Sequence, residues 1–340
     1  MRFSRLRLIC GVWAGLTILV GSTHVLAQAP RWNAPGAVFL HDSVNKTIRP
    51  LIGMAGSSYP GAPLLDGVEW ASFAPTNKSA LVSREGVLDS REGVLEWIPE
   101  LIASNPSSGT VVYKMVGVPV PQQAIWSSDS LRATALGADS KRLFWLGQFD
   151  SLPSIQASWD LDISQSAWTL LAADSSANLV LLASQQGDVG RLWIASPTKP
   201  PVTISGFSRP VAAAIAIGGT TAFVADAATH QILQVSGLSS NPVIAPVVIP
   251  EGYVGDPVGI ALSKDGSRLF VADGKGKMIR VFQTNTGVLN VELPLQLAPR
   301  SMTALTASSF VVGGRESKDQ PFYLLDTRAE GRLYFVPAGQ

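Results

Sequence analysis

Apolar and polar positions follow short, strand-like patterns along most of the chain, and turn residues separate them. Leu269–Ala272 is a continuous apolar run, typical of a strand buried on both faces. Met278–Phe282 alternates between apolar and polar residues, as a half-buried strand does, and Val288–Leu293 predicts one more strand. Asp265-Gly266 precedes the buried run and predicts a tight hairpin turn in which Gly supplies a positive φ.

The same pattern recurs along the chain. Residues 210–226 read PVAAAIAIGGTTAFVAD and residues 257–273 read PVGIALSKDGSRLFVAD, with eight identical positions and an offset of 47 residues. An Ile follows each closing Asp by six residues, and Phe39, Asp42 and Ile48 repeat this Phe-x-x-Asp-x5-Ile pattern. Fainter copies have their second strands at Ala80–Ser83, Ala133–Leu136, Leu179–Ser184 and Phe310–Gly313.

Repeats of this size predict a β-propeller. The successive units are spaced by 41 to 53 residues, and seven of them account for residues 28–340. The Ala-rich segment Val211–Ile217 has a helical alternative, but its aligned copy contains Gly259 and Asp265-Gly266. We therefore predict an all-β, single-domain propeller of seven blades, each with four antiparallel strands.

Closure of the ring has two alternatives. The first unit has no clear inner strand before Val38. Arg332–Val336 either supplies that strand, which would join the two ends of the chain, or forms the outside of the last unit. The second arrangement leaves six blades with an irregular N-terminus as the alternative to seven.

The first 27 residues predict a secretory signal peptide. Arg2, Arg5 and Arg7 precede an uncharged run, Leu8–Val20, which at 13 residues is short for a membrane span of about 20. Val25-Leu26-Ala27 fits a small-residue cleavage site, so residues 28–340 form the expected mature domain. An uncleaved membrane anchor is the alternative. Cleavage predicts an exported protein, periplasmic or extracellular, with no membrane span.

Composition narrows the function classes. The chain has 26 basic and 25 acidic residues, and removal of the leader leaves a formal charge of −2. Nucleic-acid binding is therefore not expected, because no positive excess is available to neutralise phosphates. The single cysteine, Cys10, lies in the leader, which excludes disulfides and thiol chemistry from the mature chain.

The best-defined unit supports a family resemblance. LFVADGKGKMIRVFQTNTGVLNVELPL, residues 269–295, resembles the YVTN-type repeat of exported bacterial propellers, with Phe-Val-Ala-Asp in place of the name-giving tetrapeptide. The segment from Asp42 to Arg49 is also similar to NHL repeats, which share its Asp, Asn and Ile-Arg pattern. The resemblance is good over residues 206–294 and implies a fold rather than a function. It also suggests propeller lactonases, whose motifs match no residues of this chain.

Several polar residues are candidates for a site. Asp42, Asp226 and Asp273 end their strands at the face where propellers usually bind ligands, but their recurrence at one register favours capping of the following turn. The loops that enter the inner strands are expected to crowd the same face. They offer Glu69, Gln122, Gln123, Arg209, Asp256 and Arg300.

No catalytic constellation emerges from the sequence. The mature chain has two histidines, His41 and His230, whereas a catalytic zinc site commonly has three protein ligands, so no metal site is predicted. Seven tryptophans between Trp70 and Trp193 are expected mostly in the core, with sugar stacking as the alternative for exposed ones. We therefore expect a non-enzymatic binding or scaffolding module for a protein or glycan partner, with no cofactor. The alternative is a lactonase-like hydrolase or lyase that uses a divalent cation and carboxylates such as Asp226, Asp256 or Asp273.

Overall fold

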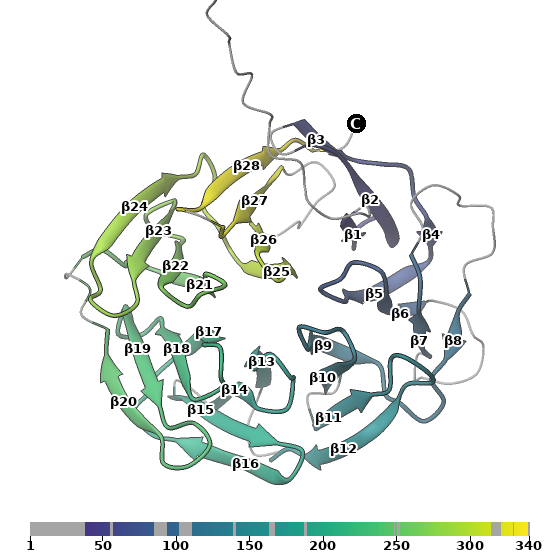
Figure 1. Cartoon of the computed structure of the whole chain (residues 1–340), viewed down its shortest axis with the longest axis horizontal. Helices are drawn as coiled ribbons and strands as arrows, with labels where there is room; N and C mark the ends of the chain where they lie inside the picture. Colours follow the sequence, from purple (N-terminus) through teal and green to yellow (C-terminus); the bar gives the residue numbers. More distant parts are fainter. Residues whose placement is uncertain are drawn as a thin grey trace, which may run out of the picture.

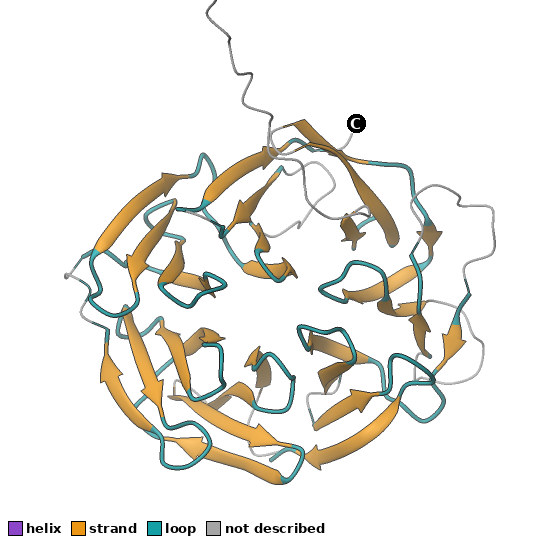
Figure 2. Ribbon diagram, viewed as in Figure 1, coloured by secondary structure: helices purple, strands orange, loops and turns teal. Residues whose placement is uncertain are grey.

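The computed structural model describes residues 38–54, 57–84, 94–101, 111–138, 141–162, 167–186, 189–247, 249, 252–313, 321–328 and 330–338. All regular structure in this part of the chain is β-strand (Figure 2). The same residues include no helix with the length and apolarity needed to span a bilayer. The predicted leader, residues 1–27, lies outside the described residues.

Seven four-stranded antiparallel sheets are arranged as blades around one axis (Figure 1). In blades 2 to 7 the chain runs from an inner strand near the axis to an outer strand at the rim, so neighbouring strands in the sequence are hydrogen-bonded neighbours in the sheet. The prediction of an all-β propeller with seven blades is confirmed, and the six-bladed alternative is wrong.

The first four blades contain 16 strands. Blade 1 contains β1 (Val38–Asp42), β2 (Thr47–Met54), β3 (Ser57–Pro60) and β4 (Leu65–Asp66). Blade 2 contains β5 (Val68–Phe73), β6 (Ala80–Arg84), β7 (Leu95–Ile98) and β8 (Tyr113–Lys114). Blade 3 contains β9 (Pro121–Trp126), β10 (Arg132–Gly137), β11 (Arg142–Gly147) and β12 (Ser154–Asp160). Blade 4 contains β13 (Ala167–Ala173), β14 (Val180–Gln186), β15 (Val189–Ser196) and β16 (Lys199–Ile204).

The last three blades contain the strongest sequence repeats. Blade 5 contains β17 (Pro210–Ile215), β18 (Thr221–Asp226), β19 (Gln231–Ser236) and β20 (Val243–Pro246). Blade 6 contains β21 (Pro257–Leu262), β22 (Arg268–Asp273), β23 (Met278–Gln283) and β24 (Leu289–Pro294). Blade 7 contains β25 (Met302–Thr306), β26 (Ser309–Val312), β27 (Phe322–Asp326) and β28 (Arg332–Val336). The Ala-rich segment that begins β17 is a strand, as its aligned copy indicated.

Blade 1 differs from the others in the order of its strands. Asp42 lies opposite Thr47, as Asp226 lies opposite Gln231 in blade 5, so β1 has the register of a second strand. β3 and β4 both pair with β2 and share its outer side. Of the two alternatives for Arg332–Val336, the one that makes it an inner strand of blade 1 is wrong. The one that places it at the outside of the last unit is confirmed, because β28 pairs with β27 as the outer strand of blade 7.

Apolar side chains hold neighbouring blades together. Seven clusters of buried hydrophobic residues occupy the seven interfaces between successive blades. The cluster that closes the ring joins Val38 and Leu40 of blade 1 to Phe322, Leu324 and Val336 of blade 7. Each blade is therefore buried on both faces, which explains why second strands such as Leu269–Ala272 are continuously apolar.

Because the strands are antiparallel, successive connections lie on opposite faces of the ring. We call the face with the turns that follow Asp42, Asp226 and Asp273 the top face. It also holds the loops that lead into the inner strands. The turns between the first and second strands of blades 2 to 7 lie on the bottom face.

Candidate functional site

Asp42, Asp226 and Asp273 occupy one position in blades 1, 5 and 6. Each ends its strand, and its cross-strand partner lies five residues later across a hairpin turn on the top face. Their exposed fractions are 3%, 0% and 2%. A carboxylate buried to this degree requires several hydrogen bonds to remain ionised, and the structure provides them.

Asp226 holds two loops together. Its Oδ2 accepts a hydrogen bond from the backbone N–H of Ser208 at 2.6 Å, and its Oδ1 accepts one from the N–H of Arg209 at 3.1 Å. The same Oδ1 accepts hydrogen bonds from Ala228 and Thr229 in the turn that follows, at 3.0 and 3.4 Å. The side chain therefore caps its own turn and also fixes the loop that enters β17.

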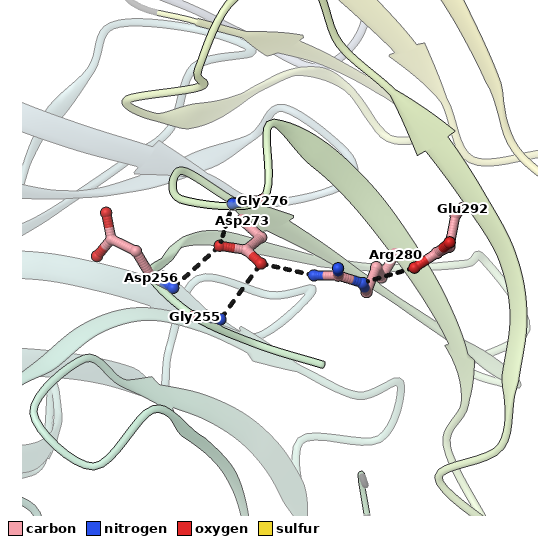
Figure 3. A network of polar contacts seen from close by, with 6 residues as sticks. All are labelled: Gly255, Asp256, Asp273, Gly276, Arg280 and Glu292. Atoms are coloured by element: carbon pink, nitrogen blue, oxygen red, sulfur yellow. Dashed lines mark hydrogen bonds and ion pairs between the residues drawn. The ribbon is translucent and has the colours of Figure 1, made fainter. Parts of the chain in front are cut away.

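Asp273 makes the equivalent contacts in blade 6 (Figure 3). It accepts hydrogen bonds from the backbone N–H groups of Gly255 and Asp256 at 3.2 and 2.9 Å. The N–H of Gly276 in its own turn donates at 3.1 Å, and the guanidinium of Arg280 contributes an ion pair at 2.5 Å.

These contacts keep Asp273 ionised. Burial raises the pKa of its carboxyl group, but the backbone N–H groups and the Arg280 guanidinium together lower it by more, so the net pKa lies below its ordinary value. Arg280 also donates from Nε to Glu292 at 2.9 Å, which extends the network to the outer strand of the blade (Figure 3).

Asp42 caps its turn with different partners. The backbone N–H of Asn45 donates to Oδ1 at 3.1 Å and the Asn45 side-chain amide donates to Oδ2 at 2.7 Å. Arg49 on β2 lies 3.5 Å from Oδ2. In all three blades, then, the recurring Asp is engaged in organising the top-face turn, which is the role that its recurrence favoured.

Arg209 and Asp256 are held at equivalent places on neighbouring blades. The N–H of each is bound by the recurring Asp, and the carbonyl oxygen of each accepts a hydrogen bond, from Ala227 at 2.9 Å and from Gly274 at 2.8 Å. The Asp256 carboxylate points away from the network (Figure 3). Arg209 is exposed, and its Nη2 donates to the carbonyl oxygen of Ala227 at 3.3 Å, whereas Asp256 is partly exposed. A cation and an anion therefore lie on a fixed backbone at the entry of β17 and β21.

The other predicted candidates lie elsewhere on the ring. Glu69 and Gln123 were expected in loops, but they belong to β5 and β9. Glu69 forms an exposed ion pair with Lys46 at 2.5 Å, and Gln123 accepts a hydrogen bond from the N–H of Leu170 at 2.7 Å. Both side chains therefore bridge neighbouring blades. Arg300 is exposed on the loop that precedes β25.

Gln122 also connects two blades, because its side-chain amide donates to the carbonyl of Trp168 at 3.1 Å. The inner strands β5, β9, β17 and β21 each have a register shift near their first residues. Glu69 and Gln122 occupy this bulge in blades 2 and 3, and the hydrophobic residues Val211 and Val258 occupy it in blades 5 and 6. The polar ring expected from the sequence is therefore limited to part of the top face.

The two histidines lie in different blades. His41 Nε2 is 2.9 Å from the carbonyl oxygen of Val68, and His230 is an exposed turn residue with φ of +55°. Among the described residues, no group of three or more His, Cys, Asp or Glu side chains is placed to hold a metal ion.

The tryptophans of blades 2 to 4 pack between blades. Trp97, Trp126, Trp145 and Trp168 are buried, and Trp70, Trp159 and Trp193 are partly buried. The indole N–H groups of Trp70 and Trp159 donate to backbone carbonyls of the next blade, at 3.0 and 2.9 Å. None of the seven is an exposed stacking platform, in agreement with the expected core role.

The link between each recurring Asp and the loop before the inner strand was not predicted from the sequence. The signal was present as a constant spacing, because Arg209 and Asp256 both precede their Asp by 17 residues. Residues that line one cleft only through packing of blades 6 and 7, such as Arg268 and Glu330, had no such signal.

Comparisons with known proteins identify the fold. No protein-family model matches the chain, and no curated protein matches it either. Solved structures do match. A candidate 6-phosphogluconolactonase from Bacteroides fragilis has a TM-score of 0.57 at 12% identity, with 89% of this chain and 94% of that chain covered. A second one, from Bacteroides uniformis, has a TM-score of 0.55 at 12% identity, with 88% and 92% covered.

A chain in the complex of KlAtg21 with the coiled-coil of AgAtg16 has a TM-score of 0.58 at 10% identity, with 85% and 92% covered. At these identities the likeness is one of fold alone. The YVTN or NHL repeat type stays a prediction.

Proposed function

We propose that the protein is an exported, non-enzymatic binding module that holds a protein or glycan partner on its top face. The observation that carries this proposal is the fixed presentation of Arg209 and Asp256. Both backbone groups of each residue are hydrogen-bonded, and the two residues occupy equivalent positions of blades 5 and 6 with an exposed Arg209 and a partly exposed Asp256. Such preorganised polar groups lose little entropy on binding, which favours recognition.

The environment of the recurring aspartates supports a structural role for them. Asp226 and Asp273 are almost fully buried, and their carboxylate oxygens already accept several hydrogen bonds each. A group that acts on a substrate must come within hydrogen-bond reach of it. Asp256 is the more accessible carboxylate of the three that the enzyme alternative names.

A lactonase-like, metal-assisted hydrolase or lyase is the second candidate. It is favoured by two structural neighbours named as candidate 6-phosphogluconolactonases and by the accessible carboxylate of Asp256. In that case a divalent cation would stabilise the folded protein by mass action. Thermal unfolding after EDTA treatment, and again with calcium, magnesium or zinc, separates the two candidates, because the binding module predicts the same midpoint throughout.

The main test uses top-face variants. Purified wild-type protein, Arg209→Ala and Asp256→Ala are compared on a glycan array and in cross-linking with extracts of the host's cell envelope. Each variant is expected to lose at least about tenfold in affinity for the partner, as a contact residue worth about 1.4 kcal/mol would. Arg142→Ala is the control, because Arg142 is half exposed in an ion pair of blade 3.

Unchanged partner binding in both top-face variants would contradict the proposal. So would cation-dependent hydrolysis of a lactone that disappears in Asp256→Ala. Equal thermal midpoints of the four proteins would show that any loss of binding comes from the altered surface and not from unfolding.

A further inference from the structure

A polar cleft lies on the bottom face, at the opposite end of the strands from Arg209 and Asp256. Its volume is about 1000 Å³, at the large end of the range for small-molecule sites. Turns and strands of blade 6 form most of its lining, and Glu330 of blade 7 completes it. Its main polar side chains are Asp265, Arg268, Gln283, Asn285, Asn290 and Glu330.

The cleft is the continuation of a hydrophobic interface. Phe270 and Val281 are buried in the cluster that joins blades 6 and 7. Arg268 and Gln283 lie two residues further along the same two strands, so they project from the same face of the sheet. The interface therefore changes from apolar to polar where the two blades reach the bottom face, and Val281 also contributes to the lining.

A close backbone approach brings blade 7 into this cleft. Gly331 has a φ of +89°, and a Cβ at this position would lie 2.5 Å from a ring carbon of Phe270. Only glycine avoids this collision without displacement of the ring. The turn of blade 7 can therefore lie directly against blade 6, and its residue Glu330 forms part of the lining.

The polar groups of the cleft differ in how they are engaged. Asp265 is part of its own turn, where it accepts hydrogen bonds from the hydroxyls of Ser263 and Ser267 at 2.5 and 2.8 Å. These hydroxyls, the Ser267 N–H and the positive charge of Arg268 lower the pKa of Asp265 to about 2. By contrast, within the described residues the side chains of Arg268 and Glu330 form no hydrogen bond or ion pair.

We propose that this cleft binds a short peptide with free ends, through Arg268 for its terminal carboxylate and Glu330 for its terminal ammonium group. Guanidinium groups bind carboxylates through two parallel hydrogen bonds. The side-chain amides of Asn285 and Asn290 offer donors and acceptors that match peptide groups. Leu289, Val291 and Val281 provide the apolar surface that peptide side chains require.

The charged side chains that line the cleft complement a zwitterionic ligand better than an anionic one. Arg268 is the one cationic side chain of the described lining, whereas Asp265 and Glu330 are both acidic. A ligand with a carboxylate alone would meet two like charges, whereas one that also carries an ammonium group complements the set. The assignment is independent of the proposed partner on the top face, because no lining residue is shared.

The test is affinity selection on the immobilised full-length protein with a random tetrapeptide library, read out by mass spectrometry. Three versions of the library are compared: free ends, amidated C-terminus and acetylated N-terminus. The wild type is expected to retain a subset of the free-ended peptides and to lose at least tenfold of this retention with either blocked library. Arg268→Gln should retain peptides with free and with amidated C-termini equally. Glu330→Gln should retain peptides with free and with acetylated N-termini equally.

Arg142→Gln, an arginine replacement in blade 3, serves as the matched control and should retain peptides as the wild type does. The proposal is overturned if the wild type retains no free-ended peptide, or if Arg268→Gln retains as much as the wild type. It is also overturned if Arg268→Gln and Arg142→Gln lose retention alike. Thermal midpoints of all variants confirm that each one is folded when it is tested.

Discussion

At the scale of single residues, one left-handed turn position recurs on the bottom face of five blades. The residue there has a positive φ, and its N–H donates to the carbonyl oxygen three residues earlier. These residues are Asn77, Ser130, Ala177, Gly219 and Gly266. Only two of them are glycine, which explains why the sequence pattern identified this turn in few blades.

The top-face turns contain a second position of this kind. Lys46, His230 and Lys277 have φ values of +51°, +55° and +50° and follow their Asp by four residues. His230 is therefore one of three equivalent turn residues, and the equivalent residues in blades 1 and 6 are lysines. The hairpin geometry imposes the left-handed conformation whichever residue occupies the position, at a cost of about 1–2 kcal/mol for a residue with a Cβ.

This conformational cost predicts opposite changes in the free energy of unfolding when Gly266 is replaced by Ala and when Lys277 is replaced by Gly. Gly266→Ala should lower the free energy of unfolding by about 0.5–1 kcal/mol, since no atom lies within 4 Å of the added Cβ and only the backbone strain remains. Lys277→Gly should raise it by about 0.5–1 kcal/mol, because an exposed residue is relieved of the same strain. Urea unfolding at neutral pH measures both, and equal signs for the two variants would contradict the argument.

At the scale of the blade, an ion pair recurs between the second and third strands. In blades 1 and 6 the pair is Asp42–Arg49 and Asp273–Arg280. Blade 2 has the opposite polarity: Arg84 stands in place of the Asp, and Glu96 stands in place of the Arg. The registers are the same, since Glu96 lies opposite Val82 just as Arg280 lies opposite Val271, two residues before the end of the second strand.

The reversed polarity predicts that the acidic and the basic residue of such an ion pair can exchange positions. Arg84 binds Glu96 through Nε and Nη2 at 2.5 and 3.0 Å, and the Glu96 side chain is 4% exposed. Glu96→Gln should lower the free energy of unfolding by about 2–3 kcal/mol, because it removes one partner of a largely buried pair. The double variant Arg84→Asp/Glu96→Arg, which copies the order of blade 6, should recover most of this loss.

A double-mutant cycle in urea measures the exchange. The expected coupling between positions 84 and 96 is favourable and exceeds about 1 kcal/mol. If the double variant is as unstable as the sum of Arg84→Asp and Glu96→Arg, the two positions do not form an interchangeable pair. The same measurement in high salt should change little, since a buried pair is weakly screened.

At the scale of the whole molecule, the hydrophobic core lies in the interfaces between blades rather than within single blades. Each of the seven hydrophobic clusters contains residues of two neighbouring blades, so no blade has a core of its own. The interface between blades 7 and 1 closes the ring through side-chain packing, and β28 remains in its own blade. The ring is therefore expected to unfold as one unit.

Leu324→Ala tests this expectation at the closing interface. Leu324 is fully buried in the cluster shared by blades 7 and 1, so its truncation should cost about 3 kcal/mol. Tryptophan fluorescence reports mainly on blades 2 to 4, where seven of the nine tryptophans lie, and far-UV circular dichroism reports on all strands. Both signals should shift to the same lower midpoint, whereas a separate early transition by circular dichroism alone would contradict a single cooperative unit.

Local patterns predicted much of this architecture. The alternation of Met278–Phe282, the apolar run Leu269–Ala272 and the turn at Gly266 each correspond to an observed element, with φ of +71° at Gly266. The structure also has regular blades between residues 68 and 204, where the repeat was faint. There the blade core is filled by tryptophans and other large side chains, which preserve volume and burial without preserving the residue pattern.

The candidate site was predicted less completely. Asp42, Asp226 and Asp273 were recognised because a repeated hairpin needs the same cap in each copy, and a cap acts on residues close in sequence. Glu69 and Gln123 were misplaced in loops, because a bulge at the start of an inner strand has no sequence signal of its own.

The sequence by itself determined the strand pattern and the capping aspartates, because each of these depends on interactions within one hairpin or one blade. It left a choice between six and seven blades, which the pairing of the first and last strands settled. Only the tertiary structure decided how the ring closes and which side chains meet between blades. The sequence left two places for Arg332–Val336, and in the structure it pairs with β27 while Val336 packs in the interface between blades 7 and 1. The cleft lined by Arg268 and Glu330 likewise depends on how two blades pack, and Gly331 allows the close approach of blade 7 to Phe270 of blade 6.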